Sequence, residues 1–218
     1  MQNLIRTLAM IALVLLISLA PASATPTPPT LQYLVENDLS MQVGDKMFYD
    51  FEFNNICSGV DPFCLPLDAS GILVVPQDID PLHHGIRFNG PASTGNFTIG
   101  YKVQVLPPSN NSASDMHLAL SGVVIDCEVG AICNILIGET LRNDQNQVIA
   151  QLQVTNTDLD DHAFFDPLKS FSVLKDISLN AYSTQRGEAN VVKFSILDQI
   201  VSQTPGEVPE PGTYALMG

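Results

Sequence analysis

Apolar and polar residues alternate one by one in several segments of this chain, and this period of two is the pattern that most restricts the fold. The clearest segment is 97–105, in which Phe, Ile, Tyr, Val and Val alternate with Thr, Gly, Lys and Gln. The pattern returns at 47–54, 147–154 and 171–179, with Lys175 an exception on the apolar face of the last. Because successive side chains of an extended chain point to opposite sides, each segment is predicted to be a half-buried strand. The apolar face of the segment nearest the N-terminus consists of Met47, Tyr49, Phe51 and Phe53.

Shorter β-like runs and turn residues fill the rest of the region. Further candidate strands lie at 71–75, 86–88, 116–125, 132–137 and 191–197. Gly, Pro and Asn residues separate these runs, and no segment shows the 3.6-residue period of a helix over three turns. Many short strands with this punctuation predict an all-β domain, an antiparallel β-sandwich of the jelly-roll or immunoglobulin-like kind. A β-barrel is the second choice.

The N-terminus has the three regions of a secretory signal peptide. A basic start precedes the apolar run 8–19, and Ala22 and Ala24 occupy the two small-residue positions of a cleavage site. The apolar run is short of the roughly 20 residues that a membrane-spanning helix needs. We therefore expect residues 1–24 to be removed on export, so that the mature chain begins at Thr25.

The chain is strongly acidic, with 23 Asp and Glu against 9 Lys and Arg and a net charge of −14. Cleavage of the signal removes Arg6 and no acid, so the mature chain is more acidic still. This charge repels nucleic acids and anionic lipid surfaces, which excludes both as expected partners. The apolar fraction of 45% and the mean hydropathy of +0.18 favour a folded body rather than a disordered one.

Four cysteines remain after the signal: Cys57, Cys64, Cys127 and Cys133. An even number of cysteines in an exported chain predicts disulfides, and four cysteines allow three pairings. We favour Cys57–Cys64 and Cys127–Cys133, because each pair closes a short loop. A zinc site fits less well, since these spacings are wider than those of common zinc motifs.

Composition divides the chain into four parts. Residues 1–24 are the signal peptide, and 25–40 form a Pro-rich leader, of which the Pro-rich part 25–30 is predicted to be extended. Residues 41–201 form the predicted sandwich domain, and 202–218 form a tail that starts with polar residues.

The tail contains a Pro-Glu-Pro motif, Val208-Pro209-Glu210-Pro211-Gly212. Its position near the end of an exported chain resembles the PEP-CTERM sorting signal of Gram-negative bacteria. In that family the motif precedes a transmembrane helix and a short Arg-rich end. The resemblance implies recognition by a membrane protease of the exosortase class and a mature protein at the cell surface or in the medium. Such proteins typically accompany exopolysaccharide production.

The body also resembles one that is common among PEP-CTERM proteins. The likeness is carried by Gly-Asp-Lys at 44–46, Gly-Tyr-Lys-Val at 100–103 and Val-Leu-Lys-Asp-Ile at 173–177. The resemblance brings no established catalytic activity that could be carried over to this body. The sequence departs from the family at Gly218, where it stops short of most of the apolar helix and the Arg cluster. Either this sequence is truncated, or the protein is not anchored. If Gly218 is the true end, we expect membrane contact only through an incomplete C-terminal anchor, and release of this 218-residue form into the medium.

A search for chemistry finds no serine-hydrolase elbow, zinc-protease motif, dinucleotide fingerprint or P-loop. The densest acidic cluster contains Asp158, Asp160 and Asp161. Oxygen ligands at alternating positions suit calcium in a loop, so these residues are candidate calcium ligands. The cluster lacks the glycine and the closing glutamate of an EF-hand, and an Asp-rich turn between strands is the alternative. No other cofactor is expected.

Three functions remain open. The first is an exported, non-catalytic protein of the cell surface or of an exopolysaccharide or biofilm matrix. The second is a carbohydrate-binding module for the matrix polysaccharide. The third is a hydrolase of that polymer, which needs only two well-placed carboxyl groups.

Overall fold

The computed structural model describes residues 27–56, 68–90, 95–127, 131–182 and 191–205. Three sequence-based predictions lie outside these residues. They are the signal cleavage site at Ala22 and Ala24, the Cys57–Cys64 disulfide, and the sorting motif 208–212.

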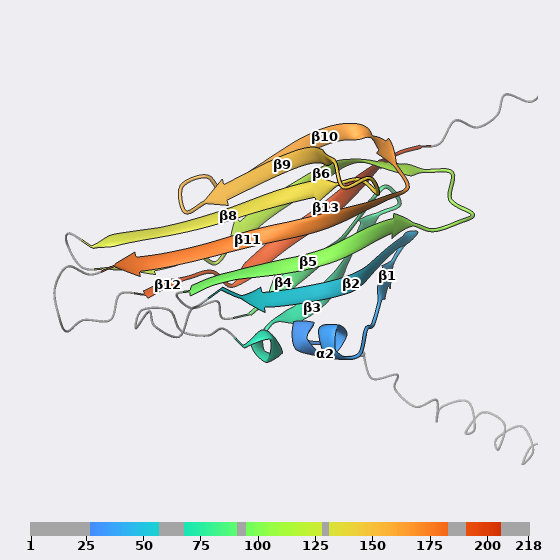
Figure 1. The fold of residues 1–218 in the computed structure, drawn as a ribbon. Coiled ribbons are helices and arrows are strands. Elements are labelled where there is room, and N and C mark those ends of the chain that lie inside the picture. Colours follow the sequence, from blue (N-terminus) through green and yellow to red (C-terminus); the bar gives the residue numbers. More distant parts are fainter. Residues whose placement is uncertain (1–26, 57–67, 91–94, 128–130, 183–190, 206–218) are drawn as a thin grey trace, which may run out of the picture.

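The chain folds into two antiparallel sheets that face each other (Figure 1). The larger sheet has the order β1 (Met41–Val43), β2 (Lys46–Asn55), β5 (Gly95–Val105), β11 (Ser170–Tyr182), β8 (Ile132–Arg142) and β9 (Val148–Thr155). The smaller sheet has the order β10 (Asp160–Leu168), β6 (Ser112–Ser121), β13 (Ile196–Thr204), β4 (His83–Asn89) and β3 (Leu73–Asp80). A separate ribbon pairs β7 (Val124–Asp126) with β12 (Val191–Lys193). The sheets are not closed into a barrel, which confirms the predicted all-β sandwich.

The core lies between the inner faces of the two sheets. On β5 every second residue is buried, as the alternation predicts: Phe97, Ile99, Tyr101, Val103 and Val105. On the neighbouring β11 the buried residues are Phe171, Val173, Lys175, Ile177 and Leu179. The exception that the sequence marks at Lys175 is therefore a lysine inside the core, with no exposed surface.

For the first half of β2, the sequence predicts the wrong residues to point into the core. Lys46 and Phe48 are buried there, whereas Tyr49 is on the outer side and only half-buried. The register with β5 shifts between Tyr49 and Glu52, and Asp50 has a φ of 55°. A β-bulge at this point reverses the alternation, so that Phe51 points inward after it. The sequence pattern runs through the bulge without a break and thus conceals it.

The second half of the predicted leader contains a helix, α2 (Leu31–Glu36), which the sequence pattern does not predict. The Oγ1 atom of Thr30 caps the helix by accepting a hydrogen bond from the backbone N–H of Tyr33 at 3.1 Å. Leu31 and Leu34 are buried, and the N–H of Leu31 donates to the carbonyl of Ile72 at 2.7 Å. Part of the leader therefore belongs to the domain.

The predicted C-terminal boundary of the domain, residue 201, is three residues too early, because β13 continues to Thr204. A short 3₁₀ turn, η1 (Ala69–Gly71), completes the described elements. Among the described residues, no helix has the length and apolarity to cross a membrane.

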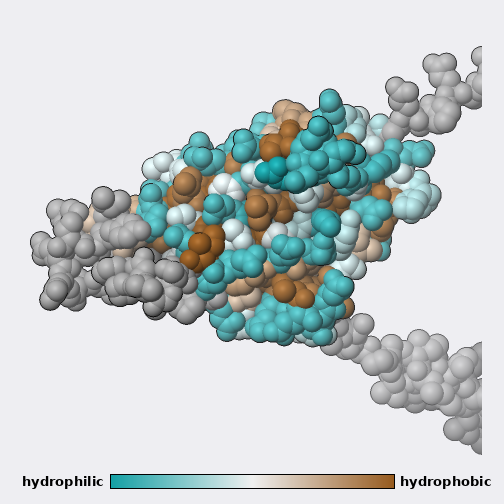
Figure 2. Space-filling view, viewed as in Figure 1, coloured by the Kyte–Doolittle hydropathy of each residue, from teal (hydrophilic) through white to brown (hydrophobic). Residues whose placement is uncertain are grey.

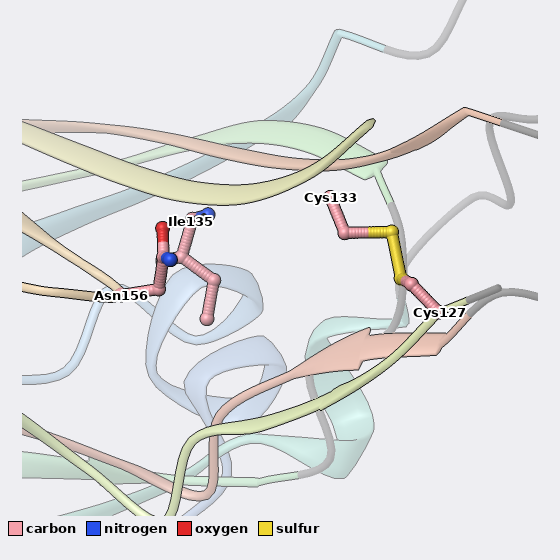
Figure 3. The surroundings of a disulfide bond; sticks show 4 residues. All are labelled: Cys127, Cys133, Ile135 and Asn156. Atoms are coloured by element: carbon pink, nitrogen blue, oxygen red, sulfur yellow. Dashed lines mark hydrogen bonds between the residues drawn. A yellow bond between two sulfur atoms is a disulfide. The ribbon is translucent and has the colours of Figure 1, made fainter. Parts of the chain in front are cut away.

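The predicted Cys127–Cys133 disulfide is confirmed (Figure 3). It joins the residue after β7 to the second residue of β8, with a Cα–Cα distance of 6.6 Å. In the same part of β8, the backbone N–H of Ile135 donates to Oδ1 of Asn156 at 3.3 Å. The bridge thus attaches the small β7–β12 ribbon to the larger sheet.

Replacing both Cys127 and Cys133 by serine should lower the free energy of unfolding by about 2 kcal/mol, because the bridge closes a short loop in the unfolded chain. Urea titration of the purified domain would measure the change. An unchanged unfolding midpoint would show that the bridge does not restrict the unfolded chain.

Candidate functional site

The outer face of the larger sheet carries a shallow trough made of two adjoining hollows, which share Lys102, Asn146 and Ser172. The first hollow is also lined by Asp50, Glu52, Thr140, Arg142 and Leu174. The second is also lined by Tyr49, Asn143 and Asp144. Figure 2 shows this face of the molecule, on which hydrophobic patches are interspersed among hydrophilic ones.

The floor of the trough is open because a glycine occupies an outward position of β5. Gly100 pairs with Glu52 on β2 and with Leu174 on β11. A Cβ atom on Gly100 would lie 3.4 Å from the Glu52 side chain, at van der Waals contact, and would narrow the floor. Leu174 keeps 45% of its surface exposed, so it presents an apolar spot between polar walls.

The bulge on β2 forms one wall of the trough. There the Asp50 carboxylate meets Nζ of Lys102 at 2.7 Å. The hydrogen bond to Asp50 and the negative charge of Asp50 raise the pKa of Lys102 above its ordinary value. Both side chains are about half exposed, so the pair contributes about 1 kcal/mol or less to stability. The pair therefore positions two charges rather than holding the fold together.

The β8–β9 hairpin forms the opposite wall, and its loop is held by side-chain hydrogen bonds. Oδ1 of Asn143 accepts from the backbone N–H of Gln145 at 3.1 Å and of Gln147 at 2.9 Å. Nη1 of Arg142 donates to the carbonyl of Asn146 at 3.0 Å. A loop held this way loses less conformational entropy when a ligand binds.

The trough combines three kinds of group that a polar, ring-shaped ligand needs. Amides and hydroxyls supply both donors and acceptors, as at Asn146, Thr140 and Ser172. Arg142 supplies a planar fork of donors. The ring of Tyr49 and the exposed side chain of Leu174 supply apolar contact area. This arrangement suits binding of a polyhydroxylated molecule.

The Gly-Asp-Lys turn at 44–46 is a second polar centre, between β1 and β2. The Asp45 carboxylate accepts from Oγ of Ser109 at 2.5 Å and from Nε2 of Gln203, and Nζ of Lys46 lies 3.6 Å away. Burial raises the pKa of Asp45, but these hydrogen bonds and the charge of Lys46 outweigh it and hold the pKa below its ordinary value. Asp45 thus ties the turn to β13 and to the connection after β5.

The acidic cluster at 158–161 lies where β9 connects to β10. The carbonyl of Asp158 accepts from the N–H of Thr155 at 2.6 Å, and Oδ2 of Asp161 accepts from the N–H of Gln153 at 2.8 Å. Asp160 starts β10. The part of the chain that the structure describes contains no group of three His, Cys, Asp or Glu side chains that would hold a metal ion. The geometry matches the alternative of an Asp-rich strand connection, and calcium binding here stays a prediction.

A third polar group lies in the core and was not foreseen as a site. Lys175 on β11, Glu139 on β8 and Gln199 on β13 meet there, and Nζ of Lys175 donates to both of the other side chains. The sequence marks only Lys175, as an exception in an apolar row. Glu139 and Gln199 carry no local signal, because their pairing with Lys175 is set by strand order.

Comparisons with known proteins add little to this picture. No protein-family model matches the chain, and no curated protein sequence matches it. Among solved structures it is similar to a chain of the "Glycosylation Associate Protein (Gap123) complex from Streptococcus agalactiae", with 10% identity and a TM-score of 0.30. The match covers 75% of this chain and 25% of that chain. A likeness of this degree carries no conclusion on function.

The turn at Asp45 leads to a prediction about pH. Lys46 has no exposed side-chain surface, and burial lowers its pKa from 10.5 to about 8. The unfolded chain keeps this proton up to about pH 10.5, whereas the folded chain releases it near pH 8. The contribution of Lys46 to stability therefore rises between pH 8 and 10.5, by roughly 3 kcal/mol at most.

The variant Lys46→Met should be more stable than the parent at pH 7, and its advantage should shrink as the pH rises to 10.5. Denaturant unfolding of both proteins at several pH values measures this difference. Lys102→Met is the matched control, because its ammonium group is half exposed and should produce no such convergence. A constant difference between Lys46→Met and the parent would contradict the burial of a charged amine.

Proposed function

We propose that this chain is an exported, non-catalytic protein of the cell surface or extracellular matrix, sorted through its C-terminal Pro-Glu-Pro motif. The observation that carries the proposal is the pairing of an N-terminal secretory signal with residues 208–212 at the other end of the chain. The sandwich domain between these two signals is the part that would be exported. Its expected processing partner is an exosortase-type membrane protease of a Gram-negative bacterium, and exopolysaccharide is its expected surrounding.

The carboxylates of the trough support a non-catalytic role. A glycosidase needs one carboxyl group as acid and another as base or nucleophile, about 5–9 Å apart. Here the Asp50 carboxylate is ion-paired with Lys102, and Oδ2 of Asp144 accepts a hydrogen bond from Oγ of Ser170 at 2.7 Å. Two of the three acids of the trough thus have structural partners, which leaves Glu52 as the remaining acid and favours binding over hydrolysis.

A sorting experiment tests the proposal directly. The gene is expressed in its host and in a strain that lacks the exosortase, and the mass of the secreted or surface-bound protein is measured. We expect the N-terminus at Thr25 and a processed C-terminus only where the protease is present. Glu210→Ala should abolish C-terminal processing, whereas Glu207→Ala, an acid just outside the motif, should not. Identical C-terminal masses in all four samples would refute sorting through this motif.

A second candidate function, carbohydrate binding, is favoured by the trough. It is lined by amide, hydroxyl and guanidinium groups together with the Tyr49 ring and the exposed Leu174 side chain. Sugars present hydroxyl groups around an apolar ring face, so a bound sugar would contact the polar and the apolar groups of the trough at the same time. Matrix polysaccharide is therefore the ligand class that we propose for the trough.

Binding of the host's exopolysaccharide, measured by calorimetry, should weaken about tenfold or more in Tyr49→Ala and in Arg142→Ala, which is about 1.4 kcal/mol. Tyr33→Ala is the matched control, because Tyr33 is an exposed tyrosine on α2, outside the trough. It should bind like the parent. Equal affinity in all variants, with unchanged melting temperatures, would remove the trough as the binding surface.

A further inference from the structure

The polar cluster in the core brings together an amine, a carboxyl group and a carboxamide. Lys175 and Gln199 have no exposed surface, and Glu139 keeps only 2%. Lys175 and Glu139 are direct cross-strand partners on β11 and β8. Gln199 comes from β13, the middle strand of the other sheet. The cluster thus bridges the two layers of the sandwich.

The orientation of the three groups is defined by hydrogen bonds. Nζ of Lys175 donates to Oε1 of Gln199 and to Oε2 of Glu139. Nε2 of Gln199 donates to the carbonyl of His117 on β6 at 2.9 Å. This second bond holds the carboxamide with its oxygen, and hence its Cδ carbon, beside the amine.

We propose that Nζ of Lys175 and Cδ of Gln199 become joined by an isopeptide bond, which cross-links the two sheets through the core. The proposal is independent of the trough and of the sorting signal. It rests on the juxtaposition of a buried nucleophile, a buried carbonyl carbon and a buried acid–base group.

The environment favours this reaction over a stable ion pair. Burial lowers the pKa of Lys175 and raises the pKa of Glu139, so the proton is more readily transferred from the amine to the carboxylate than in water. The resulting neutral amine is a nucleophile. Because both reacting groups are held in contact, the reaction has the high effective concentration of an intramolecular step.

The atoms balance without an oxidant, a reductant or a co-reactant. Lys175 gives one proton to Glu139, and the amine nitrogen then adds to Cδ of Gln199. Glu139 passes that proton to Nε2 of Gln199 and takes a second proton from Nζ. The Cδ–Nε2 bond breaks, ammonia leaves, and an amide between Nζ and Cδ remains.

Glu139 has an atom available for this proton transfer. Among the residues that the structure describes, its Oε1 atom is buried and has no hydrogen-bond partner, and the same holds for the Tyr101 hydroxyl. The Tyr101 ring lies beside the amine, with 6.0 Å between its centroid and Nζ of Lys175. An aromatic wall excludes water, which would otherwise solvate the charged forms and stop the reaction.

The cross-link would close the chain between β11 and β13 and join the sheets at their centre. The Cys127–Cys133 bridge, in contrast, joins a peripheral ribbon to one sheet. Unlike a disulfide, this amide bond would not be cleaved by thiols.

The intact mass of the purified full chain, measured after reduction and denaturation, tests the proposal. We expect a mass that is one ammonia molecule lower than the mass of the sequence between the observed ends of the purified chain. Tryptic cleavage after Lys175 should be lost, and fragment spectra should show one peptide that contains Lys175 joined to another that contains Gln199. This measurement requires no variant and therefore no assumption about variant folding.

Variants then assign the roles. Lys175→Met and Gln199→Met should restore the full mass, and Glu139→Gln should restore it in most molecules, because the acid–base group is lost. Gln203→Met is the matched control, because Gln203 is a buried glutamine on the same strand that contacts Asn111 and Asp45 instead. It should keep the mass loss.

Two outcomes would overturn the proposal. A full mass in the parent protein would show that the three groups form only a hydrogen-bonded ion pair. A mass lower by one water molecule would show a bond between Lys175 and Glu139 instead.

Discussion

The rest of the sandwich depends on how one lysine is accommodated between its sheets. An amine without exposed surface needs partners, and an unpaired buried charge costs several kcal/mol. The partners of Lys175 are Glu139, its cross-strand neighbour on β8, and Gln199 from the facing sheet. A slip of β8 by one residue would turn Glu139 outward, and a different placement of β13 would remove Gln199. The cluster thus specifies both the register within one sheet and the position of the other.

The β-bulge at Asp50 links the fold to the trough. The bulge at Asp50 turns Phe51 into the core and leaves Asp50 and Tyr49 on the outer face. Without the bulge, Tyr49 and Phe51 would lie on the same side, so the core would either lose Phe51 or exchange Phe48 for Tyr49. One irregular residue therefore serves two purposes, because it completes the core and shapes the candidate binding surface.

The sequence predicts well those structural features that depend only on residues close together in the chain. The alternation at 97–105 defines a strand without help from the rest of the chain, and the Cys127–Cys133 loop is short enough to pair locally. The inner face of β2 was mispredicted because the bulge keeps the pattern while reversing the faces. Helix α2 was missed because six residues are too few for a periodic signal. The trough and the core cluster join residues from distant strands, and only the strand order brings them together.

The placement of the basic residues indicates which ligand charge the outer surface favours. Of the 9 Lys and Arg in the chain, Lys46 and Lys175 are buried, so the surface is more acidic than the composition suggests. Such a surface repels polyanions at long range. Lys102 and Arg142 bring two of the remaining cations into the trough, which also contains Asp50, Glu52 and Asp144. The trough is therefore nearly balanced in charge within an acidic surface, and a neutral polysaccharide fits it better than a strongly anionic one.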